Sequence, residues 1–519
     1  MRRQSRLSII GMLAILATRT TNGCAFLSPL QLPRAGLETA TATTTGGPRQ
    51  QKLRMTAALN GPFSAKQRAV VVGGGPAGAL MALYLSRSRG FEVDVFEAFE
   101  ESKISGPTTR SWNVVLFERG SRALENAGVD LRKEAGESVL TLTGLVRHHA
   151  AEKKKGMFTG STSICRGSLA KSLLDKASRM PDVNVHYGCA FSKVDMGRRA
   201  ATFEHASGDT VEREYDMLVG ADGVNSRVRK CLEEDVPGFT VRQQEDHMEF
   251  KTISIPIMAM QEAGESWKTC FHVANSEIGC IIGPSAPEGI VTASIVLPSQ
   301  GKNTFDALMK TPQDVRDFFG THYPCAFGPE GPSEEAAKDF LERRPQRLRS
   351  TYCSSLSHGN IVLIGDAAHS MYASLGQGVN SALEDSQVFA QVLDSAMEGS
   401  ASDQAVDVPG LLAAYNERRL EDALAAVTLS EGGMGGARTV RLPYQAKLFV
   451  TILLNKTLGR LAPKVFAPPS LFTIGGPEVP YAAILRGEKR ESTVARGLLF
   501  SAIAVAAIAV RVLRTTRVI

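Results

Sequence analysis

The sequence lacks the features of several protein classes. Its eight cysteines are scattered, with no CxxC pair and no Cys/His cluster of zinc-site spacing, so neither a disulfide scaffold nor a metal site is expected. The apolar runs near its two ends are shorter than the roughly 18 residues of a typical membrane span. With 22% charged and 43% hydrophobic residues, the chain is neither disordered nor collagen-like. Its 519 residues allow several domains.

Acidic residues are almost missing from the first 68 positions, where ten Lys and Arg accompany a single Glu. Residues 485–519 carry seven Lys and Arg and two Glu. Because the whole chain has a net charge of +6, the body between these ends has a net charge of −8. A mildly acidic body argues against nucleic-acid binding. Basic ends are typical of targeting segments and membrane contact.

The N-terminal region has the pattern of a two-part targeting address. Residues 1–25 combine a basic start, the short apolar run Leu7–Thr18 and the small residues Gly23 and Ala25, as a signal peptide does. Residues 26–66 are rich in Ser, Thr, Ala and Arg, which is typical of a transit peptide. The segment GCAFLSP resembles the cleavage motif of proteins sent to the plastids of secondary-plastid algae. We therefore expect a plastid protein; a secretory or endoplasmic reticulum location and a mitochondrial outer-membrane location are the alternatives.

The C-terminal region is expected to be helical over 405–497 and to end in a membrane anchor at 498–513. The apolar run Leu498–Val510 lies between Arg496 and Arg511, whose side chains could reach the lipid headgroups. Its length alone would also fit a buried core helix.

A nucleotide-binding pattern begins at residue 68. The β-branched run RAVVVG is typical of a buried parallel strand. It leads into GGGPAG, which places Gly73, Gly75 and Gly78 in GxGxxG, and a helical segment follows. A second strand, FEVDVFE, ends at Glu97, where a carboxylate takes a ribose hydroxyl. Strand, glycines, helix and acid together predict dinucleotide binding, with the phosphates at the helix N-terminus.

Two later segments indicate which dinucleotide is bound. Residues 216–230, DMLVGADGVNSRVRK, contain a strand followed by Asp222 and Gly223. Residues 360–386 contain a strand, then Gly365 and Asp366, then a GQG loop and a helix from about Val379. Either segment alone could be a strand ending in an Asp-Gly turn. Their order after GxGxxG favours a flavin protein.

With these segments the chain resembles the single-component FAD-dependent aromatic hydroxylases over about residues 67–400. TRSWNVVLFERG (109–120) is similar to a block of the members that hydroxylate kynurenine at position 3. The resemblance implies an α/β fold: a Rossmann-like FAD-binding domain with a mainly antiparallel β-sheet substrate domain inserted at about 237–345. The strand-like runs 250–258, 277–283 and 290–297 agree with such a sheet.

The resemblance also implies which residues hold FAD. The ADP half would be held by the phosphate loop and the acid that follows it, the remainder by Arg166, the DG and GD motifs and the GQGxN loop against the flavin ring. The residues concerned are Gly73, Gly75, Ala77, Gly78, Glu97, Arg166, Asp222, Gly223, Gly365, Asp366, Gly376, Gly378, Val379 and Asn380.

The chemistry implied by the resemblance is hydroxylation with NADPH, or NADH, and O2 as co-substrates, through a flavin C4a-hydroperoxide. The flavin carries this chemistry, so neither a catalytic side chain nor a metal is required. The helix from Val379 would point its positive end at the negative charge of reduced flavin.

The chain departs from the family where the substrate is held. Ala373 stands where the family has a proline, which removes a restraint on the loop over the flavin. Gly144 and Phe158 align with the arginine and tyrosine that read the substrate carboxylate, and Gly433 and Gly436 align with two further polar residues. Trp112 is a candidate lining residue. Such a pocket suits a larger or less polar substrate. The alternatives to a kynurenine hydroxylase are thus an oxygenase or epoxidase of an isoprenoid or pigment-related molecule, and a flavoprotein subunit without turnover.

Overall fold

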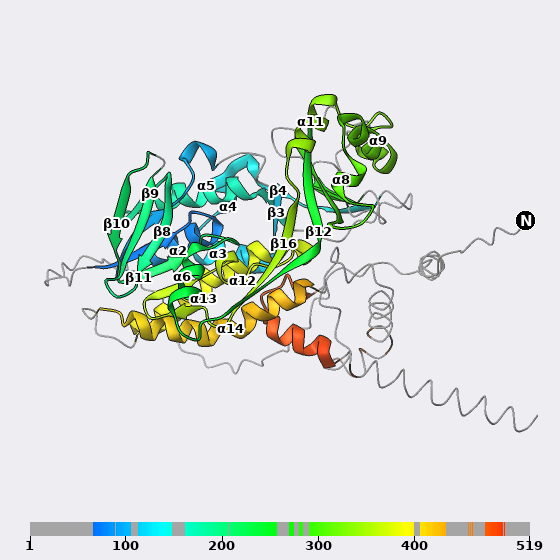
Figure 1. Cartoon of the computed structure of the whole chain (residues 1–519). Coiled ribbons are helices and arrows are strands. Elements are labelled where there is room, and N and C mark those ends of the chain that lie inside the picture. Colours follow the sequence, from blue (N-terminus) through cyan, green and yellow to red (C-terminus); the bar gives the residue numbers. More distant parts are fainter. Residues whose placement is uncertain are drawn as a thin grey trace, which may run out of the picture. The chain divides into compact units, whose positions relative to one another are not determined.

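The computed structural model describes residues 66–493 apart from 89, 105–112, 148–160, 206, 257–268, 274–279, 284–289, 399–404, 432–454, 456, 458, 460–472 and 491–492 (Figure 1). The predicted signal peptide, nearly all of the transit segment and the anchor at 498–513 lie outside these residues. So do Trp112, Phe158, Gly433 and Gly436. Within the described part of the chain, no helix combines the length and apolarity needed to cross a membrane.

A six-stranded sheet forms the nucleotide-binding half. β1, the predicted strand after residue 66, lies inside this sheet and pairs in parallel with β2 and β11. Only the short edge strand β17 runs antiparallel. The order is β17 (Ser357–His358), β18 (Ile361–Leu363), β11 (Met217–Gly220), β1 (Gln67–Val72), β2 (Phe91–Phe96) and β7 (Val183–His186).

Helices cover this sheet and complete the main apolar core. α2 (Pro76–Arg87) begins within the GxGxxG motif, directly after Gly75, with Pro76 in its first turn, where no N–H is needed. It packs against α5 (Arg166–Ala177) and α13 (Gly378–Glu398). α13 also contacts α3 (Glu118–Asn126) and α14 (Val408–Glu431). The predicted strand–helix–strand unit is therefore present, and the helix predicted from about Val379 begins at Gly378.

Two small sheets and several short helices flank the nucleotide-binding half. One sheet has the order β10 (Thr210–Glu214), β9 (Ala200–His205), β8 (Cys189–Asp195), and the other has the order β3 (Asn113–Leu116), β6 (Thr162–Cys165), β4 (Leu140–Thr141). The short helices are α4 (Leu131–Ala135), α6 (Arg227–Asp235) and α12 (Asp366–His369).

A second six-stranded sheet, here called the roof, forms the predicted substrate region. Its long strand β12 pairs antiparallel with both neighbours, whereas β5 joins the far edge in parallel. Both edge strands, β5 and β16, come from outside 237–345. The order is β16 (Gln346–Cys353), β12 (Val241–Pro256), β15 (Ile290–Pro298), β14 (Cys280–Ile282), β13 (Cys270–Val273) and β5 (Gly144–Arg147). The sheet is thus mainly antiparallel, as predicted.

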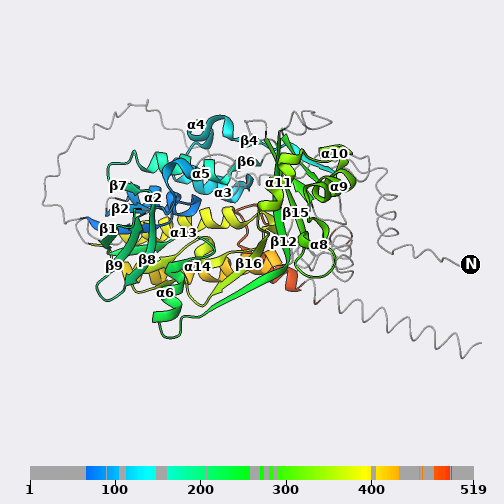
Figure 2. The same ribbon diagram turned by 45° about the horizontal axis from the view of Figure 1, so that its top comes forward.

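Four helices pack with the roof and were not predicted from the sequence (Figure 2). They are α8 (Phe305–Leu308), α9 (Pro312–His322), α10 (Pro324–Phe327) and α11 (Glu334–Glu342). Their aromatic side chains and the inward residues of β15 form a second apolar core, which includes Phe319, Phe340 and Ile295. Alternate residues of β15 are buried because one face of the sheet meets these helices.

The C-terminal region is described over 473–490, where residues 481–490 are helical. Ile474, Tyr481 and Ile484 form a third apolar cluster with residues of α14. This segment is therefore an integral part of the core.

Candidate functional site

The three glycines of the phosphate loop play different structural roles. A Cβ on Gly73, whose φ is +102°, would lie 2.5 Å from the carbonyl oxygen of Ala221. A Cβ on Gly78 would lie 2.0 Å from the carbonyl oxygen of Gly73. Both glycines are therefore needed for close packing. A Cβ on Gly75 would meet nothing within 4 Å, so the loop opens onto free space at the N-terminus of α2.

Glu97 connects the end of β2 to this loop. Its Oε2 accepts a hydrogen bond from the Gly74 amide at 2.7 Å, and its Oε1 accepts one from the Phe99 amide at 2.9 Å. The side chain is 9% exposed. A carboxylate is thus held beside the open face of the loop, as ribose binding requires.

The DG motif is held by its own aspartate. The carboxylate of Asp222 accepts hydrogen bonds from the Ser226 hydroxyl at 2.5 Å and from the amides of Arg227 and Val228 at the start of α6. Burial raises the pKa of Asp222, and these hydrogen bonds oppose that rise. Gly223 has a φ of +79° and allows the turn. The visible role of Asp222 is therefore to hold the turn.

Arg229 joins the DG and GD motifs, which are far apart in the sequence. This buried guanidinium donates to the carbonyl oxygens of Val224 and Ala367, both at 2.7 Å. Gly365, with a φ of +58°, lies against Ala77 of α2, since a Cβ there would be 3.2 Å from that of Ala77. The motifs predicted to share one cofactor thus converge on one region.

Asp366 and Arg166 meet in that region. Burial raises the pKa of Asp366, while the charge of Arg166 at the start of α5 lowers it. Both residues are exposed to solvent, so their charged groups remain accessible to a polar ligand.

The loop predicted to lie against the flavin is fastened by Asn380. Its Oδ1 accepts a hydrogen bond from the Phe117 amide, and its Nδ2 donates to the carbonyl oxygens of Val115 and Gly376, each at 2.9 Å. Asn380 is fully buried, so its side chain serves to fasten the loop to β3. Gly376 has a φ of +64°, Gly378 begins α13, and Val379 is partly buried against the main core.

Asp385 is the centre of a buried hydrogen-bond and ion-pair network that was not predicted from the sequence. Its carboxylate accepts a hydrogen bond from the Gly365 amide at 2.7 Å, bonds Nε2 of His369 at 2.6 Å and pairs with Nε of Arg419 at 2.7 Å. Burial would raise its pKa, but His369 and Arg419 outweigh this effect, and the pKa is lowered. Asp385 therefore holds the GD turn, and His369 is committed to the same network.

Arg119 of the predicted block 109–120 extends this network to the C-terminal segment. It pairs with Glu384, which also binds Arg419, and donates to the carbonyl oxygens of Gly476 and Val479. Its guanidinium lies 4.1 Å from the centre of the Tyr481 ring. The only signal in the sequence was the position of Arg119 within that block, because its partners lie more than 250 residues away.

The residues predicted to line the substrate pocket are less well defined. Gly144 lies in β5, opposite Cys270 in the roof. Ala373 is exposed and begins the turn that leads to Gly376. The remaining candidates lie outside the described residues.

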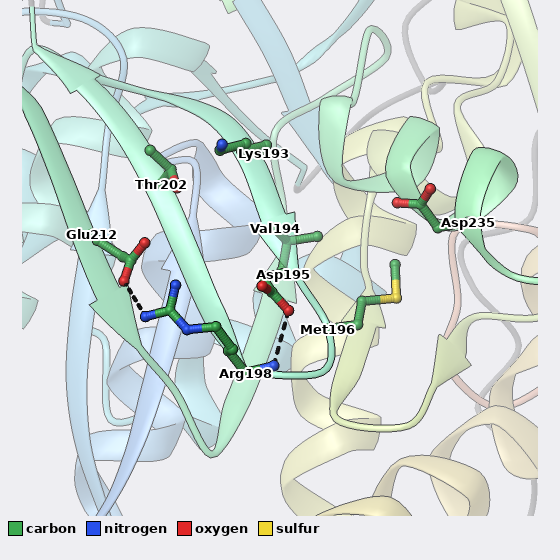
Figure 3. Close-up of a pocket in the computed structure, with 8 residues that line it drawn as sticks. All are labelled: Lys193, Val194, Asp195, Met196, Arg198, Thr202, Glu212 and Asp235. Atoms are coloured by element: carbon green, nitrogen blue, oxygen red, sulfur yellow. Dashed lines mark hydrogen bonds and ion pairs between the residues drawn. The ribbon is translucent and has the colours of Figure 1, made fainter.

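A separate hollow borders the β8–β10 sheet (Figure 3). Its charged groups are largely paired, since Arg198 binds Glu212 and the Arg198 amide donates to Asp195. In the described residues, no group of three His, Cys, Asp or Glu is arranged to hold a metal. The residues that line the hollow are Lys193, Val194, Asp195, Met196, Arg198, Thr202, Glu212 and Asp235.

The converging motifs fit an FAD molecule. Gly75 leaves room for a pyrophosphate at a helix N-terminus, Glu97 presents a carboxylate beside it, and Arg166 and Asp366 present exposed charged groups. A positive helix end, an acid for ribose and exposed polar groups match the parts of a flavin dinucleotide.

Comparison with known proteins agrees with this geometry. Residues 66–430 match the family described as FAD binding domain. Kynurenine 3-monooxygenase of Drosophila willistoni is 27% identical over 416 residues, covering 78% of this chain and 86% of that protein. Kynurenine 3-monooxygenase of Salinispora arenicola is 29% identical over 447 residues, covering 83% and 92%. The solved structure of 2-methyl-3-hydroxypyridine-5-carboxylic acid oxygenase has a TM-score of 0.56 at 21% identity, covering 79% of this chain and 96% of that one, and shares the fold.

Proposed function

The chain belongs to the FAD-dependent aromatic hydroxylases, a family of flavoprotein monooxygenases, and we propose that it hydroxylates a small aromatic substrate with NAD(P)H as reductant and O2 as oxidant. The observation that supports this proposal most directly is the phosphate loop. Gly73 and Gly78 are packed against backbone, whereas Gly75 faces open space beside the carboxylate of Glu97.

The protein's own part in such a reaction is to bind, orient and shield. Bound FAD would supply the oxygen chemistry. The loop before α13 would face the flavin ring, and the positive end of this 21-residue helix would favour negative charge there. Asn380 and Asp385, both in the first half of α13, bind the start of that helix to β3 and to the GD turn. A loop held by buried contacts excludes water and keeps its geometry.

The first substrate to test is L-kynurenine, because two relatives that match most of the chain are named for its hydroxylation. Against it stands Gly144, which offers no side chain where the family places an arginine. The reaction class and the substrate are therefore separate parts of the proposal.

The test uses the full-length, FAD-loaded protein. NADPH and NADH consumption is measured with and without L-kynurenine, and the product is examined by mass spectrometry for one added oxygen atom. Stimulated consumption with 3-hydroxykynurenine as product supports both parts. FAD reduction without a kynurenine effect supports the reaction class and rejects this substrate. A protein that binds no FAD, or whose FAD is not reduced, contradicts the proposed function.

We also propose delivery to a plastid and attachment to its membrane, based on the composition of residues 1–66 and on the apolar run at 498–513. A fluorescent fusion carrying residues 1–66, expressed in a secondary-plastid alga, tests the address. Fluorescence outside the plastid would reject it. Separately, the full chain is expected to sediment with membranes, and a chain ending at residue 497 is not.

A further inference from the structure

Asp246 is a buried acid whose second oxygen has no partner. It lies in β12 where the pairing with β16 shifts, between Glu245 and Glu249. Its side chain is 7% exposed, and its Oδ2 makes no hydrogen bond. Buried carboxylate oxygens are almost always bonded, so an unpaired one marks a place where a ligand or water belongs.

The neighbouring acids in β12 are in a different situation. Glu245 pairs with Arg349 at 2.7 Å and with Arg347 at 3.2 Å, and Glu249 pairs with Arg347 at 3.0 Å. Arginines are thus available at this edge of the roof, yet in the described part of the chain none pairs with Asp246. The carboxylate of Asp246 is instead buried.

The groups that act on Asp246 include a tyrosine, a second carboxylate and a histidine. Tyr372, which is 5% exposed, has its pKa raised to about 12 by burial and by the charge of Asp246. Glu431, at the end of α14, accepts hydrogen bonds from the hydroxyls of Ser350 and Tyr352, both at 2.9 Å. Burial and Glu431 raise the pKa of Asp246, while the amides of His247 and Met248 and the charge of His247 lower it.

This group of side chains adjoins the loop expected to cover the flavin. The Tyr372 amide donates to the Ser430 hydroxyl at 3.1 Å, and the Ser374 hydroxyl donates to the Ser430 carbonyl oxygen. Tyr372 and Ser374 flank Ala373, where the turn toward Gly376 begins. β12 and β16 run side by side from this region to the roof (Figures 1 and 2).

We propose that Asp246 is a substrate-recognition residue, which accepts a hydrogen bond from an N–H or O–H group on the ring of an aromatic amine or phenol. The inference rests on the proposed function and narrows its substrate class. A donor on the ligand satisfies Oδ2, whereas a hydrocarbon of the same shape leaves it buried and unpaired. Sites built around such a bond reject the analogue that lacks it. An apolar isoprenoid substrate is therefore disfavoured.

The test compares three probes of similar shape, namely phenol, aniline and toluene, on the full-length FAD-loaded protein. Their dissociation constants are measured from the change that each causes in flavin absorbance. We expect phenol or aniline to bind roughly tenfold or more tightly than toluene, and the better of the two identifies the donor. In Asp246→Leu this preference is expected to fall to about twofold or less, with toluene binding unchanged or tighter.

Two further variants keep the test decisive. Glu245→Leu removes an exposed, arginine-paired acid of the same strand and is expected to retain the preference. Asp246→Asn preserves the shape and is expected to reduce the preference about threefold or more, because a neutral oxygen is a weaker acceptor; it serves if the leucine variant does not fold.

Equal binding of all three probes by the unaltered protein would overturn the inference, as would no response to phenol or aniline, or a preference that survives Asp246→Leu. None of these results affects FAD reduction by NAD(P)H, on which the proposed function is judged separately.

Discussion

The hydroxyl group of Tyr481 donates a hydrogen bond to Oε1 of Gln377 at 2.9 Å, and both side chains are buried. Gln377 lies between the two glycines of the loop expected to face the flavin. Tyr481 belongs to the C-terminal segment and lies under the guanidinium of Arg119. Through this hydrogen bond the C-terminal segment supports the loop that contains Gln377.

Tyr481→Phe should weaken FAD binding without disrupting the fold. Loss of the hydroxyl leaves Oε1 of Gln377 buried and unpaired, which costs about 1–3 kcal/mol. Thermal unfolding and FAD titration measure the two effects. Tyr84→Phe is the matched control, since this buried hydroxyl bonds the Ala123 carbonyl oxygen in another part of the core. Equal FAD affinity in both variants would contradict a role for Tyr481 in supporting the loop.

Gly75→Ala should weaken FAD binding, whereas Gly78→Ala should destabilise the fold. The first adds a methyl group to open space, so the protein should fold with unchanged melting temperature and bind FAD roughly tenfold or more weakly. The second places a methyl group 2.0 Å from a carbonyl oxygen and should lower stability by several kcal/mol, on the order of 3. Thermal melts followed by circular dichroism measure the loss of stability, and FAD fluorescence titration measures the loss of FAD affinity. A Gly75→Ala variant with unaltered FAD affinity would argue against pyrophosphate binding at this loop.

Asp385→Asn should destabilise the protein strongly at neutral pH. The substitution leaves Arg419 buried without its full counter-charge, which typically costs about 3–5 kcal/mol. The lowered pKa of Asp385 means that its contribution is fully present above the unfolded value and is lost as the pH falls through the folded value. Urea unfolding at pH 7 and at about pH 2, well below the unfolded value of 3.8, checks this. The difference between variant and unaltered protein should shrink at the lower pH.

Lys251→Met should stabilise the protein at pH 7. Burial lowers the pKa of Lys251 to about 8, so below that pH the folded protein carries a buried positive charge that costs stability. Because the unfolded chain holds the extra proton between pH 8 and 10.5, the stability of the unaltered protein rises across this window. The Lys251 ammonium group lies 4.4 Å from the centre of the Phe340 ring, which offsets part of the cost. We expect a gain of about 1–2 kcal/mol at pH 7, smaller at pH 10, from thermal melts.

The parts of the site that are close in sequence could be predicted from the sequence. The spacing of Gly73, Gly75 and Gly78 reflects one turn between a strand and a helix, and local sterics determine it. Asp385 and Arg419 could not be paired in this way, because many acidic and basic residues are available and only packing brings these two together. The same holds for Arg119 and the carbonyl oxygens of Gly476 and Val479.

The elements of the roof differ in how well they could be predicted from the sequence. The predicted runs 250–258, 277–283 and 290–297 overlap β12, β14 and β15, while β13, β16 and the helices were not predicted. Signals for two of the helices were present: Thr311 caps α9 with Asp314 in a capping box, and Ser333 caps α11. The four-residue helices α8 and α10 are too short for periodicity to reveal them.

Strand β5 has a consequence for protein engineering. It lies between β4 and β6 in the sequence, yet it pairs with β13 in the roof. Exchanging residues 237–345 as a cassette with a relative would place foreign strands against both edge strands of the roof, β5 and β16. A chimera intended to transplant substrate preference should extend the cassette to residue 353 and carry residues 144–147 along with it, so the swap needs two exchanged segments instead of one.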